Sequence, residues 1–151
     1  MKVNSTLLMP KEVTMKTVAV AGHFDPFHEG HLLHIVEASK LGDYLYVFVS
    51  NDGDAVKKKG KVNIEQSWRI EIVRLITRGL GIMGVVLPTL DEDGTQTKTL
   101  MHYKPDIFAK GGDRTPDNMP KSEIRVCEEI NCKIMYGVGK QLNESSKMVM
   151  V

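Results

Sequence analysis

The sequence lacks the features that mark several large classes of protein. Its apolar runs are far shorter than the roughly 18 residues that a membrane-spanning helix requires. Basic side chains exceed acidic ones by only one charge, 20 against 19, so no overall basic field attracts nucleic acid or an anionic membrane. We therefore expect neither nucleic acid nor a membrane among its partners.

Cysteine is also scarce, with Cys127 and Cys132 as its two instances. If the first ends a helix and the second begins a strand, a disulfide between them is geometrically unfavourable. Residues 1–14 carry only a short apolar patch and a proline, too little for the core of a secretory signal. We expect two buried thiols without a catalytic role, in a cytoplasmic protein.

The 151 residues, 42% hydrophobic and 26% charged, suit one globular domain with a substantial core. Short apolar runs predict strands at 17–21, 44–49, 82–87, 106–109 and 132–136, and helical periodicity predicts helices at 30–41, 64–77, 95–103 and 121–131. This alternation predicts an α/β, Rossmann-like domain over residues 15–151, with a five-stranded parallel sheet and helices on both faces. Residues 1–14 are expected to form a loose arm. In such sheets ligands bind at the carboxyl ends of the strands.

A polar segment from Gly22 to His31 follows the first predicted strand, with the sequence Gly-His-Phe-Asp-Pro-Phe-His-Glu-Gly-His. We expect Gly22 and Gly30 to let a ligand approach the backbone closely. The free N–H groups of the following helix favour phosphate, and His28 and His31, three residues apart, face the same side of its first turn.

This segment resembles the Gly-x-Phe-Asp-x-x-His-x-Gly-His signature of the cytidylyltransferase-like nucleotidyltransferases, which include glycerol-phosphate cytidylyltransferases and heptose-phosphate adenylyltransferases. The resemblance implies that His28 and His31 stabilise charge that grows on an α-phosphate. It also implies a nucleotide-binding role for Gly22, His23, Phe24, Asp25 and Gly30. Asp25 is expected to organise the turn, and His23 stands where relatives usually carry a smaller residue.

The same resemblance assigns basic residues outside the signature. Lys58 and Lys61 follow the second strand, in what we expect to be a loop that closes over the substrate phosphates. Lys58 and Arg78 join the catalytic group, and Lys58 and Lys98 are expected to bind the acceptor.

Two further segments match the family. Gly111, Gly112 and Asp113 follow the fourth strand, where the family often has Gly-Gly-Asp against the nucleotide. Near the C-terminus, residues 140–147 resemble the family's Arg-Thr-Glu-Gly-Ile-Ser-Thr-Thr. There Lys140, Ser145 and Ser146 are expected to bind the nucleotide phosphates, although lysine replaces the arginine at 140 and a threonine at 147.

The implied reaction is attack by a phosphate or phosphonate acceptor on the α-phosphorus of CTP or ATP, with Mg²⁺ as cofactor and pyrophosphate as product. The resemblance also allows a homodimer, and predicts no protein-bound metal. Three alternatives remain: a nucleotide-binding module that has lost catalysis, a metal-dependent hydrolase that uses the histidine cluster, and a dinucleotide-binding redox protein. The absence of a Gly-x-Gly-x-x-Gly pattern disfavours the last of these.

Overall fold

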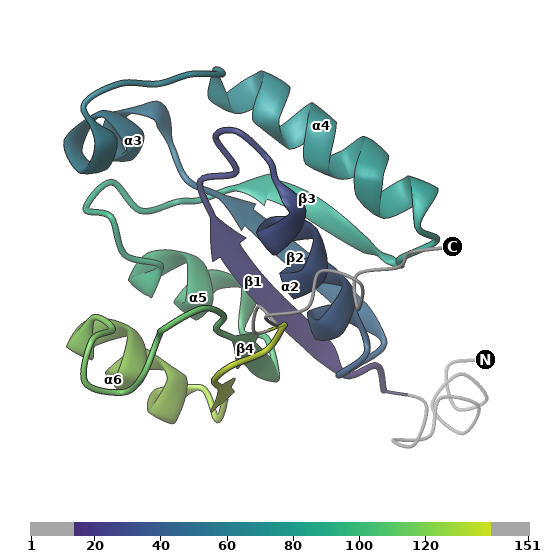
Figure 1. The fold of residues 1–151 in the computed structure, drawn as a ribbon. Helices are drawn as coiled ribbons and strands as arrows, with labels where there is room; N and C mark the ends of the chain where they lie inside the picture. The colour runs from purple at the N-terminus through teal and green to yellow at the C-terminus, as the bar shows by residue number, and fades with distance from the viewer. Residues whose placement is uncertain (1–13, 140–151) are drawn as a thin grey trace, which may run out of the picture.

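The computed structural model describes residues 14–139 of the chain. Its strands are β1 (Thr17–Gly22), β2 (Tyr44–Val49), β3 (Gly84–Pro88), β4 (Ile107–Ala109) and β5 (Lys133–Met135). Its helices are α2 (Glu29–Ser39), α3 (Asp52–Lys59), α4 (Gln66–Gly79), α5 (Thr97–Tyr103) and α6 (Lys121–Glu129). The strands form one parallel five-stranded sheet in the order β3-β2-β1-β4-β5 (Figure 1). The predicted α/β fold is confirmed.

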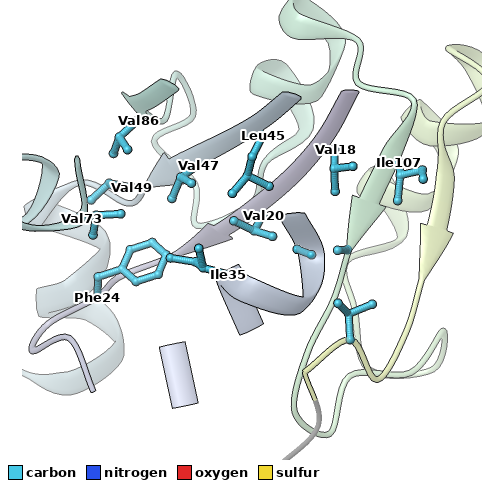
Figure 2. Packing of buried hydrophobic residues seen from close by; sticks show 13 residues of the cluster. Val18, Val20, Phe24, Ile35, Leu45, Val47, Val49, Val73, Val86 and Ile107 are labelled. Atoms are coloured by element: carbon cyan, nitrogen blue, oxygen red, sulfur yellow. The ribbon is translucent and has the colours of Figure 1, made fainter. Parts of the chain in front are cut away.

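The sheet is covered on both faces because successive strand residues point to opposite sides. On one face Val18 and Val20 of β1 pack with Ile35 of α2 and Val73 of α4. Figure 2 shows this layer, in which side chains of neighbouring strands line one face of the sheet and Ile35 lies against them beside Val20 and Phe24. On the other face Ala19, together with aromatic residues of β2 and β4, packs against α5 and α6.

The strand order reverses at the centre of the sheet. From β1 the chain adds β2 and then β3 on one side, and it then returns to place β4 against the opposite edge of β1. The connections that follow β1 and β4 therefore diverge onto opposite faces and leave a crevice at the carboxyl ends of these strands. The histidine-containing segment follows β1 and the Gly-Gly segment follows β4, so both lie at this crevice.

One helix differs from the sequence expectation. Residues 52–59, predicted to be a loop, form α3. Asn51 caps this helix by accepting a hydrogen bond of 2.7 Å from the Asp54 amide, and Gly60 ends it with a φ of 84°. The lysines at 57–59 therefore lie in a last helical turn, where the helix dipole favours positive charge.

The remaining predicted elements agree with the structure to within two residues at each end. At α4 the difference has a visible cause, since the Ile64 amide donates to Asp25 and the helix begins at Gln66. Cys127 and Cys132 are buried free thiols. No helix within residues 14–139 is long and apolar enough to cross a bilayer. Nearly all of the expected N-terminal arm lies outside the described residues.

Candidate active site

A cavity of about 760 Å³ opens at the carboxyl ends of β1 and β4. Its walls come from the turn after β1, the first turns of α2, the helix α3, the loop before α5, the end of β4 and the start of α6. Many residues that the sequence singled out line it: Gly22, His23, Phe24, Asp25, His28, Gly30, His31, Lys58, Gly111 and Gly112.

The two signature histidines cap α2 reciprocally. His28 is the N-cap residue, and its Nδ1 accepts a hydrogen bond of 3.0 Å from the Gly30 amide. His31 Nδ1 in turn accepts a bond of 3.2 Å from the His28 amide, and the two rings stack with centroids 3.8 Å apart. Because Nδ1 is an acceptor in both rings, each neutral imidazole carries its proton on Nε2. The cavity wall thus presents two imidazole N–H donors beside a helix N-terminus.

The surroundings keep two cavity histidines neutral near pH 7. Burial, followed by the charges of His28, His34 and Lys59, lowers the pKa of His31 to about 4. Burial and the nearby lysines of α3 likewise lower the pKa of His23 to about 4. In the free protein these rings are therefore hydrogen-bonding groups rather than cations.

Asp25 joins the turn after β1 to the start of α4. Its carboxylate accepts hydrogen bonds from the amides of Asn63 and Ile64, at 2.8 and 2.7 Å, and lies 3.4 Å from Lys59 Nζ. Burial alone would raise the pKa of Asp25, but these bonds and the lysine charge outweigh it, and the pKa is lowered. The carboxylate thus acts within the protein as an anchor.

Arg69 supports the same turn from beneath, and its role was missed in the sequence. It is fully buried on α4, and its Nη1 donates to the carbonyl oxygens of His23 and Ser50 at 2.7 and 2.9 Å. Its Nε donates to the Ile64 carbonyl oxygen at 2.7 Å. Its spacing in the sequence indicates that it is buried. Arg69 lies four residues before Val73, so both side chains lie on the same, buried side of the helix.

The signature glycines Gly22 and Gly30 lie against side chains of the same segment. A Cβ on Gly22 would lie 3.1 Å from the Phe24 ring, and one on Gly30 would lie 2.9 Å from Cε1 of His28. These glycines therefore make room for neighbouring side chains of the signature. Both also line the cavity, and close approach of a ligand to their backbone stays a prediction. Gly111 likewise makes room for His34, whose Nδ1 would lie 2.8 Å from a Cβ there.

The basic residues divide into two groups. Lys57, Lys58 and Lys59 of α3 line the cavity, although Lys59 Nζ already donates to the Asp25 carbonyl oxygen at 2.6 Å. Lys110, at the end of β4, also lines it and was missed in the sequence. Lys61 is exposed in the loop after α3, outside the cavity lining.

The structure does not bring Arg78 and Lys98 to the cavity. The start of α4 lies at the carboxyl edge of the sheet, so Arg78, in its last turn, lies toward the opposite edge and is exposed. Lys98 is exposed on α5 and lines a separate groove with Met101 and Arg125. The direction of α4 corrects the expected position of Arg78. Lys98 lies in the first turn of α5, near the cavity edge, but its side chain lines the separate groove.

Two further predictions have different outcomes. Asp113 is exposed beyond the cavity lining, and its carbonyl oxygen accepts a bond of 2.9 Å from Asn118 Nδ2. Lys140, Ser145 and Ser146 lie outside the described residues.

Three of the described histidines, His28, His31 and His34, make hydrogen bonds within the protein. No group of three or more histidine, cysteine, aspartate or glutamate side chains suited to a metal ion occurs in the described part of the chain. Nδ1 of His34 lies 2.8 Å from the Val138 carbonyl oxygen, so this ring supports a neighbouring turn.

Comparison with known proteins places the chain in a family. The model of the cytidylyltransferase-like family matches residues 19–136. The bifunctional protein HldE of Desulfatibacillum aliphaticivorans is 33% identical over 122 residues, which are 80% of this chain and 23% of that protein. The FAD synthase of Methanosarcina barkeri is 34% identical over 100 residues, 66% of this chain and 67% of that protein. The chain thus spans about a quarter of the HldE protein.

Solved structures show the same fold. A lipopolysaccharide core biosynthesis protein from Thermoplasma volcanium aligns with a TM-score of 0.63 and 29% identity, over 82% of this chain and 96% of that one. A bifunctional NMN adenylyltransferase/ADP-ribose pyrophosphatase from Francisella tularensis aligns with a TM-score of 0.59 over 89% of this chain and 41% of that one; at 16% identity it shows the fold alone. With the family match over most of its length, the chain belongs to the cytidylyltransferase-like family.

Proposed function

We propose that this protein transfers CMP or AMP from CTP or ATP to a small phosphorylated or phosphonate acceptor and releases pyrophosphate. The observation that carries the proposal is the reciprocal cap of His28 and His31, which holds two imidazole donors at the start of α2. Lys57 and Lys58 line the same cavity and supply positive charge. Such an arrangement suits the phosphate groups of a nucleotide.

The chemistry needs positioning and charge neutralisation more than a base. An acceptor phosphate oxygen, already ionised near pH 7, forms a bond to the α-phosphorus while the bond from that phosphorus to the bridging oxygen of pyrophosphate breaks. The two Nε2–H groups donate to oxygens that gain charge, and Lys58 offsets charge on the triphosphate. No proton has to be removed from the attacking oxygen, so the histidines are needed as hydrogen-bond donors and no general base is required.

The proposal includes Mg²⁺, which would neutralise the triphosphate and orient its leaving group. Oxygen ligands are present, because Asp54 and Asp93 line the cavity. Burial, and then the charges of Asp93 and Asp91, raise the pKa of Asp54. A cation near these carboxylates would relieve that repulsion, which supports the proposal that Mg²⁺ enters together with the triphosphate.

The relatives support the reaction class. FAD, the product for which the Methanosarcina relative is named, contains the phosphate–phosphate linkage that the proposed reaction forms. The HldE relative is a longer protein, so its complete activity is not carried over to this chain.

The test is a pyrophosphate-release screen with Mg²⁺, CTP or ATP, and a panel of glycerol phosphate, sugar phosphates, phosphonates and flavin mononucleotide. His31→Ala is the test variant, and His102→Ala, which removes an exposed ring on α5, is the matched control. Release that needs one nucleotide and one acceptor, and that is lost by at least about 100-fold in His31→Ala alone, supports the proposal. Nucleotide binding without release for any pair favours a module that has lost catalysis.

A further inference from the structure

A carboxylate in the cavity wall lacks a hydrogen-bond partner at one of its oxygens. Glu123, near the start of α6, lines the cavity and is 3% exposed. Its Oε2 accepts a hydrogen bond of 2.8 Å from the Gln96 amide. Its Oε1 is one of two buried side-chain atoms in the described residues without a hydrogen-bond partner, the other being His23 Nδ1.

The nearest cation does not satisfy this oxygen. Lys110 Nζ lies 3.9 Å from Glu123 Oε1, close enough for attraction between charges but too far for a hydrogen bond. The ammonium is held in place because it also lies 4.5 Å from the centroid of the Phe108 ring. Burial lowers the pKa of Lys110, and the charge of Glu123 opposes that change.

Two other cavity carboxylates, Asp25 and Asp93, differ from Glu123. Both oxygens of Asp25 accept backbone amides, and Asp93 accepts from the amide and hydroxyl of Thr95 at 3.0 and 2.7 Å. A buried carboxylate oxygen without a donor is costly, and a bound ligand that supplies a donor removes that cost.

The distance between Lys110 Nζ and Glu123 Oε1 limits the kind of ligand group that can contact both atoms. At hydrogen-bond lengths of about 2.8 Å, one oxygen can contact both the ammonium and the carboxylate across their 3.9 Å separation. That oxygen has to accept from Lys110 and donate to Glu123. A hydroxyl group does both, whereas a carbonyl oxygen only accepts and an ammonium only donates.

We infer that Lys110 and Glu123 form a specificity-determining pair that reads a hydroxyl group of a bound substrate. The inference rests on the proposed function, because the hydroxyl is carried by the nucleotide ribose or by the acceptor. The pair selects the substrate and takes no part in bond formation at phosphorus. It lies in the same cavity as the histidine cap, so one ligand can contact both.

The test measures binding by calorimetry, so it does not depend on turnover. One arm compares ATP and CTP with their 2′-deoxy and 3′-deoxy forms. The other arm compares ribose 5-phosphate with 2-deoxyribose 5-phosphate, and glycerol 3-phosphate with the phosphate of propane-1,3-diol. Each ligand is measured with wild-type protein, Glu123→Gln, Lys110→Met and, as a control, Glu128→Gln, which changes an exposed carboxylate on the same helix.

Wild-type protein and Glu128→Gln are expected to bind the hydroxyl form of at least one pair about 10- to 100-fold more tightly than its deoxy form. Glu123→Gln and Lys110→Met are expected to lose that preference. Glutamine still accepts from the Gln96 amide but offers an amide donor at the second position, so the fold is retained; thermal unfolding checks this. The arm that shows the preference identifies the substrate that carries the hydroxyl.

Two results overturn the inference: wild-type protein that distinguishes no pair, or Glu123→Gln with an unchanged preference. Failure of the proposed function gives a different result, in which the hydroxyl preference is present but no combination of substrates releases pyrophosphate.

Discussion

Nη1 of Arg69 donates a hydrogen bond of 2.7 Å to the carbonyl oxygen of His23, 46 residues earlier in the chain. The same side chain reaches the carbonyl oxygens of Ser50 and Ile64, so one guanidinium holds three backbone segments that border the cavity. The shape of the turn before the histidine cap is therefore set from α4.

Replacement of Arg69 by methionine should lower the stability of the protein. Methionine fills part of the volume but removes the donor from three buried or part-buried carbonyl oxygens and from the Asp52 carboxylate. We therefore expect a loss of about 3–5 kcal/mol in the free energy of unfolding. Urea denaturation measures this loss. Arg74→Met, which changes an exposed arginine on the same helix, should change stability by less than about 1 kcal/mol. Equal effects of the two substitutions would show that the buried bonds contribute little.

Gly30→Ala should impair activity while it leaves the stability of the fold nearly unchanged. Alanine normally favours a helix by up to about 1 kcal/mol over glycine, but here its Cβ would lie 2.9 Å from Cε1 of His28 and displace that ring. We expect pyrophosphate release to fall by at least about 10-fold while the midpoint of thermal unfolding changes little. Gly79→Ala is the control, because nothing lies within 4 Å of a Cβ there. Full activity in Gly30→Ala would contradict the proposed placement of the His28 ring.

The two neutral histidines predict a loss of stability in mild acid. The pKa values of His23 and His31 are lowered to about 4 in the folded protein, from 6.5. Between pH 6.5 and 4 the unfolded chain therefore binds protons that the folded protein does not, and stability falls as the pH falls through this range. Because both rings are partly exposed, we expect on the order of 1 kcal/mol for each.

Urea denaturation at several pH values tests this dependence. His31→Asn should have a shallower slope of stability against pH between 6.5 and 4 than wild-type protein. An unchanged slope in His31→Asn would mean that this ring takes up its proton normally in the folded protein.

Asp25→Asn should destabilise the protein near neutral pH. One carboxylate oxygen becomes an NH₂ group that faces a backbone amide donor at Asn63 or Ile64, so we expect a loss of at least about 2 kcal/mol. The pKa of Asp25 is lowered in the folded state, so its contribution is present above pH 3.8 and is lost as the pH falls through the lower folded value. The difference from wild type should therefore shrink in strong acid. Asp117→Asn, in an exposed loop, is the control for denaturation at both pH values.

The sequence predicted the sheet well because a short run of apolar, β-branched residues is enough to indicate a buried strand. It failed at α3, whose apolar residues are only Ala55 and Val56, too few for a recognisable stripe. The information was present in another form, as an asparagine cap, acidic residues in the first turn, lysines in the last turn and a glycine stop.

The candidate site was predictable where it is contiguous. Ten consecutive residues, 22–31, contain the histidine cap and its supporting side chains. Arg69, Lys110 and Glu123 could not be placed in the same way, because they come from separate elements that only the packed sheet brings together. Arg78 was misplaced because alignment along the chain does not reveal which end of α4 lies at the cavity.

The two walls of the cavity rest on different hydrophobic layers. The histidine wall is backed by the layer that contains Phe24 and Ile35, and the wall that bears Glu123 is backed by the layer that contains Phe108 and Val126. A change in the second layer can alter the group that the cavity accepts without moving the imidazole donors. Because the two layers are separate, proteins that descend from one ancestor can change their substrate while they keep the same reaction.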